Sequence, residues 1–360
     1  MAAVGILGIG AYLPEQVRRN DWWPEEVVAK WRARAAESLV RHEPDSPQPP
    51  SEGVRRILAA MAELKDDPFQ GTRERRLMTR GMTSSDLEVE AVKDALARSG
   101  TPPGRVGLLL TDSQLPDYLG VANAPLVHRK LGLPAGCLAF GTVAACNFLT
   151  QLHVAAPLVA SGTVEVALLV QSSGYAHLAQ MQDAHSPWFG DGATAVVVGR
   201  VADGFGVLSE AHRTNGEFFE ALVVGCPGST WHSNLDRGVA LYVQNHQAAR
   251  KMLLAIADHV KEVVGEALAR AGLSAGQIDF YATHQATAWF RRATQEYLGL
   301  SRARSFDTFG WTGSLAGANV PFSLAMAERE GMLRAGDLVA SFSGGSGVTY
   351  SSAIFRWGTA

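Results

Sequence analysis

The feature that most constrains this chain is a repeat of its own sequence. Residues 95–111, an Ala-Leu-Ala-Arg helix pattern followed by a β-rich run, match residues 267–283, which lie 172 positions later. Residues 165–170 match 337–342 at the same offset of 172. Two matches at one offset indicate a duplicated unit, and its period is too long for a solenoid. We therefore expect two similar halves, 1–185 and 186–360.

Each half is expected to alternate helices with strands. Helical periodicity runs through 86–98 and 248–270, and glycine closes each helix at Gly100 and Gly272. Strands that alternate with helices are typical of an α/β fold with parallel or mixed sheets. Residues from about 20 to 65 are an insertion in the first half, and they carry several tryptophans. We interpret these as a packing face, with a lid or a partner surface as alternatives.

Composition excludes several classes of protein. Hydrophobic residues make up 47% and charged residues 19%, so the chain can bury a large core. The net charge of −3 gives no general attraction for nucleic acid or an acidic membrane. We expect no membrane span, because no run of about eighteen apolar residues occurs, and no signal peptide, because the apolar start lacks a basic region. Three cysteines, an odd and sparse set, favour the cytoplasm.

Cys146 is the strongest candidate nucleophile. It follows small residues and precedes an apolar segment, 147–160, that is expected to be helical. A cysteine at a helix N-terminus lies at the positive end of the helix dipole, which lowers the pKa of its thiol below about 8.5. The small residues before it would let a substrate carbonyl approach the sulfur and nearby backbone N–H groups. The local context alone also fits a buried structural cysteine.

His284 is the second candidate. It directly follows the strand expected at 278–282, at the edge of a sheet where sites of α/β proteins usually lie. Its counterpart at the offset of 172 is Asp112, which also closes a strand. This equivalence favours a site over the alternative, a histidine with only a core or surface role.

Other motifs are less informative. The glycines of 342–348 are not followed by the Lys-Ser/Thr pair of a phosphate-binding loop, and we interpret the turn 189–193 as structural. No spacing of cysteine and histidine suits zinc, so we expect no metal site. The basic cluster of Arg73, Arg75 and Arg76 is either a solvated face or a phosphate contact.

Together these segments resemble the ketoacyl synthase III branch of the thiolase superfamily. Residues 10–17 are similar to its first strand and turn, and 71–76 to its Gly-Ile-Arg-Glu-Arg motif. The turn 189–193 is similar to its Gly-Asp-Gly-Ala turn. Cys146 before a helix resembles the family's nucleophile, and His284 with the following Gln-Ala resembles its His-Gln-Ala-Asn motif.

The resemblance implies a thiolase-like αβαβα layered fold of two related halves, in a homodimer. It implies that the Cys146 thiolate attacks an acyl thioester of CoA or of an acyl carrier protein. Backbone N–H groups of Cys146 and Ser346 would then hold the oxyanion. A histidine, here His284, and an asparagine would stabilise the enolate of a second, commonly malonyl, thioester. No cofactor is implied beyond these thioester substrates.

The chain departs from the family at that asparagine. Residues 313–321 are Gly-Ser-Leu-Ala-Gly-Ala-Asn-Val-Pro, and alignment back from Pro321 places Ser314 at the asparagine position. An alignment from the preceding Phe-Gly places Trp311 there instead. Asn319 lies at a helix start, too far along to substitute simply. Serine donates one hydrogen bond but reaches differently, and the loss of an oxyanion donor costs on the order of 10²–10³ in rate.

A second departure concerns the donor. In the family a tryptophan and an arginine clamp the adenine of CoA, and their positions fall near Lys65 and Phe69. We therefore expect this clamp to be absent. A carrier-protein thioester that docks beside Arg73, Arg75 and Arg76 is then as well supported as CoA.

These features favour an acyltransferase with a Cys146–His284 dyad. It would take an acyl group from a carrier-protein or CoA thioester and deliver it to a small molecule in specialised biosynthesis, with His284 as general base. One alternative is a decarboxylating synthase in which Ser314 or water replaces the lost donor. Others are a non-catalytic partner subunit of an active homologue and a hydrolase.

Overall fold

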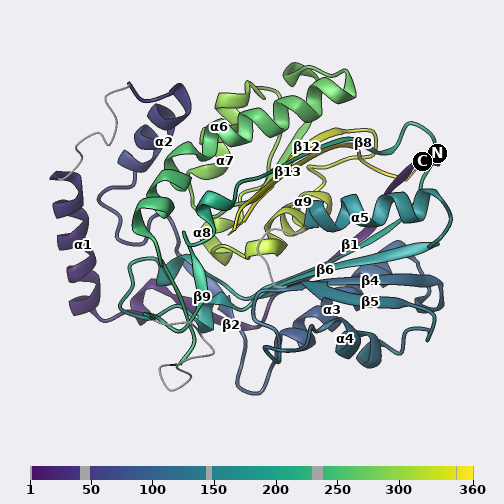
Figure 1. Ribbon diagram of the computed structural model, residues 1–360, viewed down its shortest axis with the longest axis horizontal. Coiled ribbons are helices and arrows are strands. Elements are labelled where there is room, and N and C mark those ends of the chain that lie inside the picture. Colours follow the sequence, from purple (N-terminus) through teal and green to yellow (C-terminus); the bar gives the residue numbers. More distant parts are fainter. Residues whose placement is uncertain (1, 41–48, 143–147, 229–237, 346, 360) are drawn as a thin grey trace.

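Two mixed β-sheets form the frame of the molecule (Figure 1). The computed structural model describes residues 2–40, 49–142, 148–228, 238–345 and 347–359. In spatial order, the first sheet contains β1 (Val4–Tyr12), β7 (Gly192–Arg200), β6 (Val166–Ser173), β4 (Val106–Ser113) and β5 (Leu138–Thr142). The second contains β11 (Phe280–Thr283), β12 (Leu338–Gly344), β13 (Thr349–Arg356) and β8 (Gly206–Thr214).

The two sheets repeat one topology. β4 pairs with β6 in parallel, and β6, β7 and β1 follow as antiparallel neighbours. In the second sheet β11 pairs with β12 in parallel, and β12, β13 and β8 follow as antiparallel neighbours. Strand β7 belongs to the first sheet, although its residues come after position 185 in the chain. The expected division of the chain into two halves at 185/186 stays a prediction.

Local elements also recur at the offset of 172. Helix α3 (Ser84–Ser99) ends at Gly100 with φ 63°, and α6 (His246–Ala271) ends at Gly272 with φ 67°. Both glycines take the left-handed conformation that is expected after a helix. A short 3₁₀ turn and a strand follow each helix, at Pro103–Arg105 and β4 in one half and at Ala275–Gln277 and β11 in the other.

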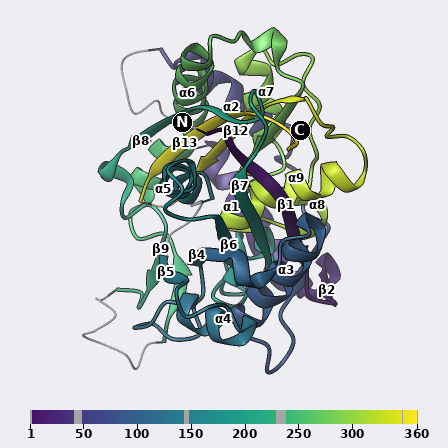
Figure 2. The same ribbon diagram turned by 90° about the vertical axis from the view of Figure 1, so that its right-hand side faces the viewer.

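Helices α5 (Phe148–Ala160) and α9 (Asn319–Arg329) lie between the sheets (Figures 1 and 2). Their apolar side chains, among them Phe148, Leu152 and Leu324, share one buried cluster with Leu110 of β4 and Val339 of β12. Because both faces of the sheets are covered, β6 is buried along its whole length.

The outer layers complete the predicted αβαβα arrangement. Helix α3 and α4 (Ala124–Leu131) pack on the first sheet, with Val92 and Val127 buried against Leu109. Helix α6 and α7 (Phe290–Leu298) pack on the second sheet, with Val260 and Phe290 in its cluster. The expected layered α/β fold is confirmed.

The insertion packs through its aromatic side chains, as expected. It contributes α1 (Glu25–Val40) and α2 (Glu52–Ala62). Trp23 and Trp31 are buried, with their ring centroids 6.3 Å apart, and each contacts the ring of Phe69, at 5.9 and 6.1 Å. Trp22 is 45% exposed and lies under the Arg18 guanidinium.

Further elements connect these layers. They are β2 (Gln16–Arg19), which pairs with β3 (Glu74–Leu77), β9 (Val223–Gly225), which pairs with β10 (Ala240–Tyr242), and the short helix α8 (Phe309–Thr312). In the part of the chain that the structure describes, no helix has the length and apolar character to cross a membrane.

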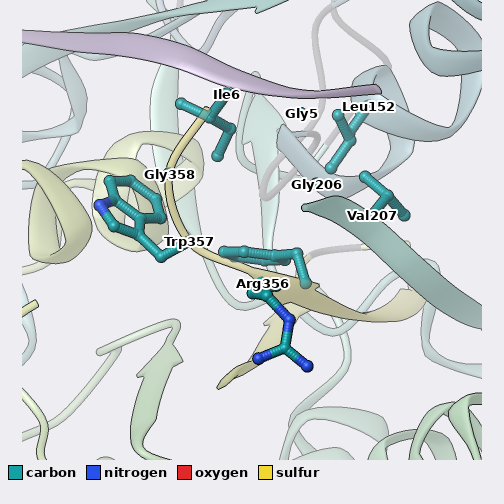
Figure 3. Close-up of a pocket in the computed structure, with 9 residues that line it drawn as sticks. Gly5, Ile6, Leu152, Gly206, Val207, Arg356, Trp357 and Gly358 are labelled. Atoms are coloured by element: carbon teal, nitrogen blue, oxygen red, sulfur yellow. The ribbon is translucent and has the colours of Figure 1, made fainter. Parts of the chain in front are cut away.

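A hollow near the two termini is too small for a substrate. Its volume is about 10 Å³, and Figure 3 shows it between Ile6, Leu152, Val207 and Trp357. A space of this size holds at most one water. We therefore place the candidate site elsewhere.

Candidate active site

A cavity of about 370 Å³ opens at the carboxyl end of the second sheet. His284 lines it, directly after β11, and its backbone N–H donates to the Phe342 carbonyl at 2.9 Å. This bond continues the parallel ladder of β11 and β12 and fixes His284 at the strand end, as the sequence predicts. Most of the cavity wall is apolar. It includes Trp188, Phe189, Leu222, Leu253, Ile256 and Phe290.

Asn319 is the side chain that orients the His284 imidazole. Its Nδ2 lies 2.9 Å from His284 Nδ1, and its Oδ1 accepts the Leu315 N–H at 2.9 Å. Because the oxygen is used by a backbone donor, the amide nitrogen must face the histidine. Nδ1 therefore accepts a hydrogen bond, and the neutral ring carries its proton on Nε2.

The environment of His284 favours this neutral form. Burial lowers the pKa of its imidazole to about 4, and a hydrogen bond with the backbone of Ala316 opposes this effect. Desolvation, which disfavours a charged imidazole, is the largest effect on this group. At neutral pH the side chain is an Nε2–H donor and a weak base.

Ser314 lies beside this pair. The residue is 3% exposed and lines the same cavity. The oxygen accepts from Asn319 Nδ2 at 3.1 Å and from the Ala316 N–H at 3.3 Å. Both acceptor positions are thus used, and within the described residues the hydroxyl hydrogen has no recorded acceptor. Ser314 can therefore donate one hydrogen bond to a group in the cavity.

The turn 189–193 holds Ser314 from the other side. The Ser314 N–H donates to the Trp188 carbonyl at 2.6 Å, and the Gly190 N–H donates to the Ser314 carbonyl at 3.1 Å. A Cβ at Gly190 would lie 1.9 Å from the Thr312 carbonyl oxygen, so only glycine fits there. The carboxylate of Asp191 accepts the Met78 N–H at 2.8 Å and ties the turn to β3. These contacts agree with the structural role expected for the turn.

Gln285 supports the site, a role that was not predicted beyond its place in the His-Gln-Ala motif. Its Nε2 donates to the Phe306 carbonyl at 2.8 Å, and its Oε1 accepts the Thr308 N–H at 2.8 Å. The side chain thereby joins the end of β11 to the loop before α8.

Cys146 and Ser346 lie outside the described residues. The helix expected after the cysteine is present as α5, which begins at Phe148. Gly344 and Gly345, which precede Ser346 in the sequence, line the cavity. The roles of Cys146 and Ser346 remain those that the family resemblance implies.

The three arginines of the basic cluster are placed differently. Arg73 is exposed. Arg75 is 1% exposed, and its guanidinium donates to the carbonyls of Pro187 and Arg18 and to Asn20 Oδ1, at 2.9 to 3.1 Å. Burial lowers the pKa of Arg75 to about 10, so it stays charged at neutral pH.

These contacts give Arg75 a structural task between β2 and β3. Arg76 is half-buried and donates to the Pro14 carbonyl at 3.3 Å. Of the expected phosphate contacts, Arg73 is therefore the side chain that is open to solvent.

Asn319 is the site residue that sequence reasoning set aside. Asn319 lies five positions after Ser314, which was expected to be too far along the chain to replace the family's asparagine. Residues 314–318, however, fold into a compact turn before α9. This turn brings the Asn319 amide to both Ser314 and His284. The available signal was a lone amide in a segment of small and apolar residues, at the expected start of a helix.

The layered fold and a histidine at the end of a parallel strand define a chain of the thiolase-fold condensing type. A model for the C-terminal region of 3-oxoacyl-[acyl-carrier-protein (ACP)] synthase III matches residues 268–357, and a second model for this synthase matches 140–216. The β-ketoacyl-[acyl-carrier-protein] synthase III of Sphingopyxis alaskensis is 32% identical over 291 residues, which cover 79% of this chain and 88% of that protein. The chain therefore belongs to the β-ketoacyl-[acyl-carrier-protein] synthase III family.

Other relatives extend the match over the whole chain. The synthase III of Sodalis glossinidius is 29% identical over 357 residues, which cover 98% of this chain and 99% of that protein. The crystal structure of the synthase III from Thermus thermophilus has a TM-score of 0.76 and 28% identity, and the match covers 99% of this chain and 100% of that one.

Proposed function

We propose that this chain is an acyltransferase that forms an acyl thioester on Cys146 and passes the acyl group to a carbon nucleophile made from a second thioester. The observation that carries the proposal is the hydrogen bond from Asn319 to His284 Nδ1. It places the imidazole proton on Nε2, where it can donate to a substrate oxygen. This choice of acceptor is the decarboxylating alternative of the sequence analysis.

The chemistry needs two donors, and the cavity offers them in His284 and Ser314. When a malonyl thioester loses carbon dioxide, the electron pair of the broken C–C bond moves into the thioester as an enolate. Donors aimed at its oxygen stabilise the developing charge. The enolate carbon then attacks the acyl carbonyl, and the Cys146 thiolate leaves. Ser314 would serve here in place of the family's asparagine.

Transfer to an oxygen or nitrogen acceptor is the second candidate. The serine at the asparagine position favours it, since enolate stabilisation is then less complete. Such a transfer needs a base whose pKa lies near the working pH. His284, with a pKa lowered to about 4 by burial and with its proton on Nε2, is poorly suited to that task. The non-catalytic reading is disfavoured by the intact network around His284.

For the donor we propose a thioester of an acyl carrier protein or of CoA. Both carry phosphate groups, and Arg73 is the exposed arginine of the basic cluster. Arg75 would not contact the phosphate directly, because its guanidinium already donates hydrogen bonds within the protein. It would support donor binding by holding the backbone near Arg73.

We also propose a homodimer that forms along β5. Among the strands that the structure describes, β5 pairs with β4 and forms the edge of the first sheet. Its Leu138 and Phe140 are 60% and 44% exposed. Tyr118 and Leu119 add further exposed apolar surface, at 71% and 63%. A sheet edge with large apolar side chains is a surface that a second copy can cover.

The experiment separates acylation from condensation. Intact-protein mass after incubation with acyl-CoA and acyl-carrier thioesters should increase by one acyl group, and Cys146→Ala should abolish the increase. Addition of a malonyl thioester should then release carbon dioxide and a β-ketoacyl product. Ser314→Ala should leave acylation unchanged and slow condensation by on the order of 10²–10³. Ser161→Ala, an exposed serine after α5, is the matched control.

Two results would overturn the proposal. The absence of any acyl adduct on Cys146, with every donor tried, would remove the acyl-enzyme. An adduct that reacts with alcohols or amines but never consumes the malonyl thioester would establish the second candidate instead.

A further inference from the structure

A second cluster of chemically active side chains lies outside the cavity that His284 lines. His153 belongs to α5, and Glu210 and His212 belong to β8. Because side chains alternate along a strand, residues 210 and 212 lie on the same face of β8. Helix α5 packs beside this sheet (Figure 2), and it brings His153 against both.

The three side chains converge on one point. His153 Nδ1 lies 3.0 Å from Glu210 Oε2, and the two imidazole rings are 4.5 Å apart between centroids. One ligand atom from each of the three lies within 4.8 Å of the others. His153 is exposed, so a small rotation of its side chain can shorten these distances to those of a shared ion.

Two buried polar atoms of this cluster have no hydrogen-bond partner in the part of the chain that the structure describes. Within the described residues, His212 Nε2 and Glu210 Oε1 are buried and make no hydrogen bond. Buried polar atoms in proteins are almost always paired. Two such atoms on neighbouring ligand-type side chains therefore point to a bound group that satisfies both.

The surroundings prepare His212 as a ligand. Its Nδ1 lies 2.9 Å from Ser351 Oγ, on the paired position of β13. With the Nδ1 proton donated to this hydroxyl, Nε2 carries the lone pair, which is how ligating histidines are usually held.

The guanidinium of Arg270, next to this cluster, is held by other groups. Arg270 Nη1 donates to the backbone carbonyl of Glu210 at 2.7 Å, and its Nη2 pairs with Glu266. The Glu210 carboxylate therefore remains directed to the histidines, with His153 on one oxygen.

We propose that His153, Glu210 and His212 bind a divalent transition-metal ion, with Zn²⁺ as the probe. Two imidazoles and one carboxylate are a ligand set that zinc commonly takes, and water would complete the coordination. The ion would join the central helix α5 to the edge strand β8. Local sequence spacing predicts no metal site here, since the histidine on α5 is 57 residues away from the carboxylate on β8.

Titration calorimetry of the untagged full-length protein with Zn²⁺ tests the proposal. One ion should bind per chain. His153→Ala and Glu210→Gln should each weaken this binding about tenfold or more, since a lost ligand costs at least as much as a lost supporting contact. His246→Ala, an exposed histidine at the start of α6, is the matched control and should bind as the unchanged protein does. Cys146→Ala tests whether the thiol of the acyl site holds the ion.

Co²⁺ in place of Zn²⁺ adds a readout that a merely structural role would not change. The visible absorption of the bound Co²⁺ should be present in Cys146→Ala and lost in His153→Ala. Binding that is unchanged in His153→Ala and Glu210→Gln, or that disappears in Cys146→Ala, would overturn the site. So would the absence of binding, which would leave His153 and Glu210 as a simple ion pair.

Discussion

At the scale of single residues, the proton of His284 is the feature from which the proposed chemistry follows. The Leu315 N–H holds the Asn319 amide in one orientation. The amide nitrogen therefore faces His284 Nδ1, and toward this atom it acts as a donor. Burial disfavours the charged form of the imidazole, so His284 is neutral at neutral pH. The same side chain that is a general base in other sites is therefore a hydrogen-bond donor here.

Asn319→Asp should reverse this arrangement. An aspartate keeps the acceptor for the Leu315 N–H, but its second oxygen accepts a hydrogen bond from Nδ1–H. The ring proton then sits on Nδ1, the pKa of His284 rises, and Nε2 becomes a base. Condensation with a malonyl thioester should slow by on the order of 10²–10³, while acylation of Cys146 changes little. Single-turnover rates of the two steps measure this. Asn245→Asp, at the capped start of α6, should change neither rate.

Acid should destabilise the protein through His284. Its pKa is about 4 in the folded state, below the ordinary value of 6.5. The unfolded chain therefore binds more protons between these values, so the stability present above pH 6.5 is lost as the pH falls toward 4. From pH 7 to pH 5 this one group should lower the free energy of unfolding by about 2 kcal/mol.

Urea unfolding at the two pH values checks this expectation. His284→Gln should show a correspondingly weaker dependence on pH. An equal dependence in both proteins would mean that His284 is not buried in the neutral form.

At the scale of elements, the turn 189–193 joins β3, β7 and the segment that carries Ser314. Gly190→Ala should lower the free energy of unfolding by about 1–3 kcal/mol, because the added Cβ would meet the Thr312 carbonyl. Gly136→Ala, which meets nothing within 4 Å, should stay within about 0.5 kcal/mol of the unchanged protein. Equal stability of the two variants, measured in urea, would contradict the tight contact.

Elements that depend on local pattern could be predicted from the sequence. The helices expected at 86–98 and 248–270 are α3 and α6, with glycine caps where periodicity ends. His284 could be predicted as a site residue because it follows a predicted strand and because its equivalent in the repeat, Asp112, also closes a strand. The roles of Asn319 and of the cluster of His153, Glu210 and His212 could not be predicted, because their contacts join elements that lie far apart in the sequence.

At the scale of the whole molecule, the exposed edge of β5 is the surface that the proposed dimer would cover. Phe140→Lys should place a charge in that interface and convert the dimer to a monomer of 38.4 kDa. Phe219→Lys, at a position that is 68% exposed elsewhere, should leave the dimer intact. Light scattering after size exclusion measures both masses. A monomeric unchanged protein, or a dimeric Phe140→Lys, would refute an interface at β5.

In the proposed mechanism His284 acts as a neutral hydrogen-bond donor beside Ser314. Nitrogen NMR of the protein with ¹⁵N-labelled histidine tests it most directly, with His284→Gln used to assign the signal. We predict that at neutral pH Nε2 carries the proton and Nδ1 does not, and that the ring titrates near pH 4. A neutral ring with the proton on Nδ1 would make Nε2 a base and refute this role, and a cationic ring at neutral pH would refute the neutral form.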